Sequence, residues 1–162
     1  MKIKDLPEAV RADVPANHLR IEPLTGVRYL VVTENSGLIL GVEAPERVWA
    51  WTDFLSGTWS REDNTFTARG IDTEDLVLSF TDEVDPVIGV ILADRIDSSI
   101  VFEQSAPLGQ TGWLRVFVRR NPDGTLYTQT VVAGGEGVPE AELHRLAESL
   151  EAEARSTAGM PI

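Results

Sequence analysis

The chain has 162 residues, of which 43% are hydrophobic and 25% are charged, as expected for one globular domain of ordinary size. It contains no cysteine, which excludes disulfides, thiolate metal sites and cysteine nucleophiles. The 26 acidic residues outnumber the 14 basic ones and give a net charge of −12, which disfavours binding to nucleic acid or to an anionic membrane.

The first part of the chain predicts a short helix followed by a strand pair. The helix is expected over about residues 6–13, before a proline that ends it. Two β runs, 27–33 and 38–42, flank the turn residues 34–37 and predict a hairpin.

A longer helix is predicted after this hairpin. Pro45 stands at an early helical position, and Val48, Trp51 and Leu55 follow at the spacing of one helix face. Gly57 is expected to end this helix.

The pattern then changes to short β runs. Strands are expected at 65–69, 76–81, 87–93, 99–103, 113–120 and 125–132. Between the last two, the residues from Asn121 to Gly124 have the sequence Asn-Pro-Asp-Gly, which predicts a type I turn closed by a glycine with positive φ.

A helix is predicted at the end, from about Pro139 to Arg155. Its apolar stripe is expected to face the sheet and consists of Leu143, Leu146, Ala147 and Leu150. Its other face carries Glu142, Glu148 and Glu151, which we expect to stay in water. We find no repeat and no linker, so the sequence predicts a single domain over residues 1–162.

The sequence contains no recognisable catalytic motif. The GxxxxGK[ST], GxSxG and HExxH patterns are all absent, and of the two histidines, His144 is expected at the surface or core edge of the last helix. General acid–base chemistry would have only Asp53, Tyr127 and His144 as candidates. We therefore name no catalytic residue, no metal ligand and no cofactor; the acidic clusters at 72–75 and 82–85 lack the spacing of an EF-hand loop.

Acidic residues are concentrated between Glu43 and Asp85. This segment carries 11 acidic residues and three arginines, a net charge of −8. Two interpretations remain open: a solvated face that keeps the protein soluble, or an acidic surface for a basic protein partner.

Three of the four tryptophans lie close together in the sequence. They are Trp49, Trp51 and Trp59, and the fourth is Trp113. Large aromatic side chains either fill a core or line an apolar ligand pocket, and the sequence alone leaves both alternatives open.

The order of elements from residue 38 resembles the START-like superfamily, which includes the polyketide cyclase and Bet v 1-type proteins. The resemblance rests on the run Gly41-Val42-Glu43-Ala44-Pro45-Glu46-Arg47-Val48-Trp49-Ala50 and on Trp113 before the Asn-Pro-Asp-Gly-Thr turn. It implies an α+β helix-grip fold in which a curved antiparallel sheet packs against the long C-terminal helix. Residues 38–157 would form this core, and residues 1–37, with a short helix and an extra strand, would be an N-terminal extension.

This resemblance and the supply of aromatic residues favour a small-molecule binding protein, with an apolar cavity between the sheet and the C-terminal helix. The residues expected to line it are Trp49, Trp51, Trp113, Arg115, Tyr127, Leu143, Leu146 and Leu150. The alternative is an acidic, non-catalytic interaction module that binds a basic partner.

No targeting signal is visible in the sequence. The start, MKIKDLPEAV, lacks the apolar stretch of a signal peptide, and the apolar run at 86–93 is far too short to span a membrane. We therefore expect a cytoplasmic protein.

Overall fold

The computed structural model describes residues 1–161, and the chain divides into two compact units. Unit 1 covers Met1–Asp97, and unit 2 begins at Ser98. Both units combine helices with antiparallel sheets, so the α+β class is confirmed. The single domain over residues 1–162 stays a prediction. The expected boundary between the N-terminal extension (1–37) and the core (38–157) falls inside unit 1.

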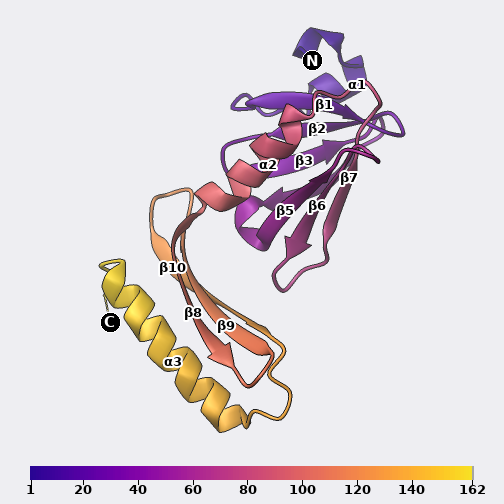
Figure 1. Ribbon diagram of the computed structural model, residues 1–162. Helices are drawn as coiled ribbons and strands as arrows, with labels where there is room; N and C mark the ends of the chain where they lie inside the picture. The colour runs from indigo at the N-terminus through magenta and orange to yellow at the C-terminus, as the bar shows by residue number, and fades with distance from the viewer. Residues whose placement is uncertain (162) are drawn as a thin grey trace. The chain divides into compact units, whose positions relative to one another are not determined.

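Unit 1 begins with two short helical turns and a four-stranded sheet (Figure 1). The 3-10 turn η1 (Ile3–Asp5) and the helix α1 (Glu8–Arg11) take the place of the one helix predicted over 6–13. The sheet is a meander of four strands: β1 (Arg20–Leu24), β2 (Arg28–Val32), β3 (Ser36–Leu40) and β4 (Pro45–Ala50). The β2–β3 hairpin confirms the predicted strand pair, whereas β1 was not predicted.

The helix predicted from Pro45 to Gly57 is wrong. This segment forms β4, the 3-10 turn η2 (Trp51–Asp53) and β5 (Phe54–Ser60). The residues at helical spacing include aromatic and β-branched side chains, which suit a pleated strand as well as a helix. Pairing with β3 decides the outcome, because it places Trp49 across from Gly37 and buries the indole ring. Pro45 is tolerated because β4 is an edge strand of this sheet.

A second antiparallel sheet follows in unit 1. It contains β5, β6 (Thr65–Gly70) and β7 (Leu76–Ser79), and the last two confirm the β runs predicted there. The end of β7 lies against the end of β1, because Leu24 bridges Phe80 and the Thr25 N–H donates to the Ser79 carbonyl at 2.9 Å. The two sheets of unit 1 therefore meet at this point.

The strand predicted over 87–93 is also wrong, because this segment begins the helix α2 (Val87–Ser98). The Asp85 carboxylate accepts a hydrogen bond from the Val87 N–H at 3.0 Å, next to a proline that suits the first turn. Ile88, Leu92 and Ile96 are fully buried at a spacing of four residues. A short apolar run fits a strand or a buried helix, and the acid–proline start was the signal that favoured a helix.

The main core of unit 1 lies between α2 and the two sheets, and Figure 1 shows α2 crossing one face of the strands. It contains Trp49, Trp51, Phe54, Phe66 and Phe80 together with aliphatic side chains from the strands and from α2. A smaller cluster joins the N-terminal turns to the first sheet through Leu6, Val10, Ile21, Val31 and Leu40. Unit 1 is therefore packed on both faces of its first sheet.

Unit 2 is a three-stranded antiparallel sheet with one long helix. Its strands are β8 (Ile100–Leu108), β9 (Gly112–Arg120) and β10 (Leu126–Ala133), in the order β10-β9-β8. The predicted turn from Asn121 to Gly124 is confirmed: the Gly124 N–H donates to the Asn121 carbonyl at 2.9 Å, and Gly124 has φ +86°. The predicted C-terminal helix is confirmed as α3 (Glu140–Thr157).

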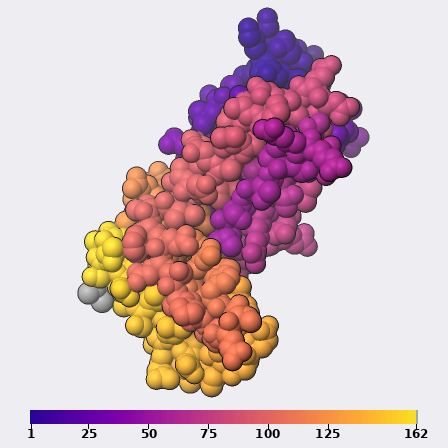
Figure 2. Space-filling view, in the orientation of Figure 1, coloured from indigo at the N-terminus to yellow at the C-terminus, as the bar shows by residue number. Residues whose placement is uncertain are grey.

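One face of this sheet packs against α3, and Figure 2 shows the yellow side chains of α3 beside the orange strands of the same unit. The buried contact joins Leu114, Val116 and Val118 of β9 to Leu150 and Ala154 of α3. Leu143 and Ala147 pack at its margin, as expected from the stripe, but half-buried Leu146 lies outside this cluster. Its position on the helix turns it to one flank of the contact.

Candidate functional site

The candidate site is an open groove between β10 and the first half of α3. Its volume is about 690 Å³, and its lining residues are Val132, Glu140, Ala141, Leu143, His144 and Ala147. Most of the lining is apolar, and the polar groups are one carboxylate and one imidazole. The groove lies entirely within unit 2.

The packing of α3 explains why the groove is open. The helix lies mainly over β9 and β8 and contacts β10 less extensively. The side chain of Val132 on β10 is consequently 43% exposed, although it points to the same face of the sheet as buried Leu114, its partner on β9. The helix side of β10 is thus left partly uncovered at Val132.

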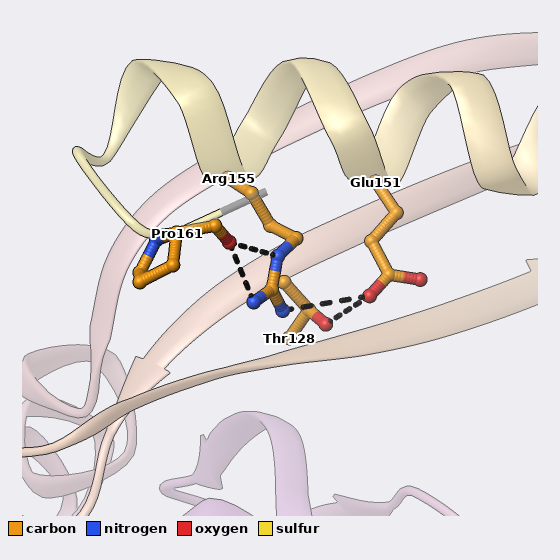
Figure 3. Close-up of polar contacts among 4 residues, drawn as sticks. All are labelled: Thr128, Glu151, Arg155 and Pro161. Atoms are coloured by element: carbon orange, nitrogen blue, oxygen red, sulfur yellow. Dashed lines mark hydrogen bonds and ion pairs between the residues drawn. The ribbon is translucent and has the colours of Figure 1, made fainter.

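A polar cluster joins α3 to β10 about one helical turn beyond the residues that line the groove (Figure 3). The Thr128 hydroxyl on β10 donates to a Glu151 carboxylate oxygen at 2.6 Å, and Arg155 lies 3.9 Å from the same oxygen. Arg155 also donates from Nε and Nη2 to the Pro161 carbonyl, at 3.0 and 2.8 Å. Glu151 was expected to stay in water, and it is instead half-buried, because it ties α3 to the strand.

The polar side chains beside the groove are mostly acidic. His144 Nε2 lies 3.2 Å from Glu148 Oε1, and both side chains are largely exposed, as predicted for His144. Glu140 stands on the first turn of α3 and lines the groove. Glu140 and Glu148 thus put two carboxylates beside the groove, which favours a ligand with positive charge.

Two of the predicted site residues belong to the core of unit 1. Trp49 is 5% exposed and Trp51 is 2% exposed, and their rings meet edge to face with centroids 5.9 Å apart. The Trp51 Nε1–H donates to the Thr33 carbonyl at 3.1 Å. These contacts are those of core-filling side chains.

Three further predicted residues lie on the sheet of unit 2, on the face away from α3. Strand alternation places Trp113, Arg115 and Tyr127 on this face. The Arg115 guanidinium lies over the Trp113 ring at 4.4 Å from the centroid and also pairs with Glu103 at 3.6 Å. The structure therefore does not bring these three residues to the groove.

Of the predicted leucines, Leu143 lines the groove, Leu150 is buried against β9, and Leu146 lies on the other flank of α3. Sequence reasoning did not include Val132, Glu140 or Ala141 in the site. Their signal was weak, because an exposed valine and a helix-start glutamate are ordinary surface residues.

The general acid–base candidates belong to two different units. The Asp53 carboxylate accepts a hydrogen bond from the Ala50 N–H at 3.0 Å in unit 1. Tyr127 and His144 both belong to unit 2, but Tyr127 points away from the helix that carries His144. In the described part of the chain, no three histidine, aspartate or glutamate side chains are grouped as a metal site would require.

Other hollows lie in unit 1. Two of them flank α2, with volumes of about 350 and 400 Å³, and the exposed Val90 lines both. Among residues 1–161, no helix is long and apolar enough to cross a membrane. No protein-family model, no curated protein and no solved structure matches this chain.

Proposed function

We propose that this protein is a binding protein that takes a hydrophobic ligand in the groove between β10 and α3. The observation that carries this proposal is the groove itself, an apolar hollow of about 690 Å³ on the surface of a two-layer unit. Ligand pockets in proteins typically measure about 300–1,000 Å³ and combine an apolar lining with a few polar groups. The groove has this composition, with Leu143, Ala147 and Val132 as its apolar part.

Titration with a neutral fluorescent probe, N-phenyl-1-naphthylamine, tests the proposal on the full chain. We expect its fluorescence to rise on binding and the affinity to fall about tenfold or more in Val132→Asp, because the new carboxylate would be desolvated by the ligand. The matched control is Val101→Asp on β8, because Val101 is 42% exposed, against 43% for Val132, and lies at the other edge of the sheet. Equal affinity for both variants, or no probe binding to the wild type, would contradict the proposal.

Membership of the START-like superfamily, with its helix-grip fold, remains a proposal. Its support is the packing of a long C-terminal helix on one face of an antiparallel sheet, the arrangement that the resemblance implies for the end of the chain. A cytoplasmic location, expected from the sequence, likewise remains a prediction.

A second candidate function is binding of a basic protein partner at one end of unit 1. The Phe80 N–H donates to the Asn64 carbonyl at 3.0 Å and so joins the β5–β6 turn to the segment before α2. Residues 41–46, which form the β3–β4 loop and the start of β4, border the β1–β2 turn nearby. The exposed acids at this end are Glu43, Glu46, Glu62, Asp63, Asp82, Glu83 and Asp85, against Arg28 and Arg61.

This acidic end suits long-range attraction of a basic protein more than tight local contacts. Asp72 and Asp75, which belong to the same sequence cluster, lie at the opposite end of β6. A partner captured at low salt should be released as the ionic strength rises, and Asp82→Asn combined with Asp85→Asn should weaken the capture. Recovery of the same protein at all salt concentrations would contradict this candidate.

A further inference from the structure

The outer edge of β10 carries backbone groups that no other strand of the described chain pairs with. The Arg120 N–H donates to Ser99 on the β8 side at 3.0 Å, so the even-numbered residues of β9 bond to β8. The odd-numbered residues of β9 therefore bond to β10. In the register of this pair, the outward-facing backbone groups of β10 belong to its even-numbered residues: Leu126, Thr128, Thr130 and Val132.

The sequence of β10 leaves this edge unprotected. The strand reads Leu-Tyr-Thr-Gln-Thr-Val-Val-Ala and contains no proline, glycine or charged residue. Natural edge strands usually carry such residues, because a bare edge pairs with other chains. The opposite edge strand, β8, follows that rule with Glu103 and Pro107. The two edges of one sheet thus differ in whether they can accept another strand.

The groove lies where a strand added to β10 would place its side chains. The side chains of the outward-pairing residues face α3, as the bond from Thr128 to Glu151 shows. In an antiparallel pair, two residues that exchange backbone hydrogen bonds have their side chains on the same face of the sheet. A residue of the added strand that pairs with an outward-facing residue of β10 would therefore point its side chain towards α3. Alternate side chains of an added strand would therefore enter the groove beside Val132, Leu143 and Ala147.

Charge decides which kind of strand fits. The flank of α3 above the groove carries Glu140, Glu148 and Glu151, and Arg155 on the same flank is engaged by Glu151 and Pro161. A second copy pairing through its own β10 would bring this same acidic flank against itself, which is repulsive. A strand with lysine or arginine is attracted instead.

We infer that β10 accepts an extended peptide segment of a partner protein by antiparallel strand addition, with apolar side chains in the groove and basic side chains at other positions of the same face, next to the acidic flank of α3. This inference rests on the proposed function, since it names the ligand of the same groove. Backbone pairing would supply affinity that is independent of sequence, and the groove and its acidic rim would select the segment.

The first test uses synthetic eight-residue peptides and the full chain. We expect a peptide with valine and lysine in turn at its groove-facing positions, and threonine at every position between them, to bind at least tenfold more tightly at low salt than the matched peptide with glutamate in place of lysine. We call these the valine–lysine and valine–glutamate peptides. The difference should shrink as salt is added, because the charges are exposed. Equal affinities for the two peptides would overturn the inference.

The second test addresses the backbone without changing the protein. N-methylation of the central valines removes the donors that face β10 in an antiparallel pair and should reduce binding at least tenfold. N-methylation of the threonines between them removes donors that point away from β10 and should change binding little. The reverse pattern, or no effect from either modification, would overturn antiparallel strand addition.

The third test changes the protein at matched positions. Thr130→Pro removes an outward-facing donor from β10, and Ser105→Pro does the same on β8. Only Thr130→Pro should weaken binding of the valine–lysine peptide. If the wild type is a dimer that Thr130→Pro converts to a monomer, the occupant is a second copy and the inference is wrong.

The naphthylamine probe separates the two proposals. If the probe binds in the groove and the peptide does not, the hydrophobic site stands and strand addition is wrong. If neither binds, both are wrong. Peptide binding that Val132→Asp weakens and Val101→Asp leaves unchanged would support both.

Discussion

Replacing Leu150 with alanine should be among the most damaging single changes in unit 2. Leu150 is 6% exposed and packs with Ala154 of α3 against Leu114, Val116 and Val118 of β9. Nearly the whole side chain is therefore out of water, and removing its three outer carbons forfeits about 2–2.5 kcal/mol of transfer free energy. Leucine-to-alanine changes lose about 2–5 kcal/mol once the cavity is counted. Because α3 is a surface helix that can settle towards the sheet, we expect about 2–3 kcal/mol.

Urea denaturation followed by far-UV circular dichroism measures this loss. In thermal unfolding followed by the same signal, a loss of 2–3 kcal/mol should lower the melting temperature by roughly 5–10 °C in a chain of this length. Leu146→Ala, on the flank of the contact, should lose less, about 1 kcal/mol. Glu148→Ala should stay within about 0.5 kcal/mol of the wild type, because its pair with His144 is exposed. Equal losses for Leu146→Ala and Leu150→Ala, or a Leu150→Ala variant as stable as Glu148→Ala, would refute the assigned helix face.

Three further changes test individual contacts. Gly124→Val should lower the free energy of unfolding by about 1–3 kcal/mol, because valine resists the φ of +86° at this position. Backbone strain is the whole cause, since the new side chain would meet open space. An unchanged urea midpoint would show that the turn relaxes. Gly37→Ala should lower the midpoint, since its methyl group would overlap the Trp49 ring, and quenched or shifted tryptophan fluorescence would accompany the loss. Hydrogen bonds from the Thr125 hydroxyl and N–H lower the pKa of Asp123 below its ordinary value of 3.8. The ionised carboxylate therefore stabilises the folded chain. This contribution is complete above pH 3.8 and is lost as the pH falls through the folded pKa. Asp123→Ala should therefore be less stable than the wild type at pH 7, and a difference in midpoint that does not shrink below pH 3.8 would contradict this cause.

Local signals in the sequence predicted the parts of the fold that depend on neighbouring residues. The Asn121–Gly124 turn carries its own proline and glycine, and α3 has a long apolar stripe with acids at its first turn. Each pattern is typical of one structure, and both predictions are confirmed. The sequence pattern from Pro45 to Gly57 fits two structures, because its apolar spacing fits a helix while its residue types fit strands. Pairing with β3, which lies earlier in the chain, made the choice.

The candidate site was harder to predict than the fold. Leu143 was included because it belongs to the stripe of α3, and His144 was placed at the helix surface. Val132 joins them only because α3 lies off-centre over the sheet and leaves β10 uncovered. That displacement depends on how the helix packs on β9 and β8, which the spacing of residues within α3 does not encode. For the tryptophans the error is the opposite: Trp49 and Trp51 were expected to line a ligand cavity, and they fill the core of unit 1.

The contact between β1 and β7 has a consequence for how the two units fold. Every strand pair in unit 2 joins strands that follow each other in the chain, so the sheet can grow by successive hairpins. Unit 1 must also bring Leu24 to Phe80, with the six strands β2 to β7 in between. Closing such a long loop loses chain entropy before the contact returns any free energy, and contacts that are distant in sequence slow folding. We therefore expect unit 2 to fold faster than unit 1 and the closure of unit 1 to be the slow step.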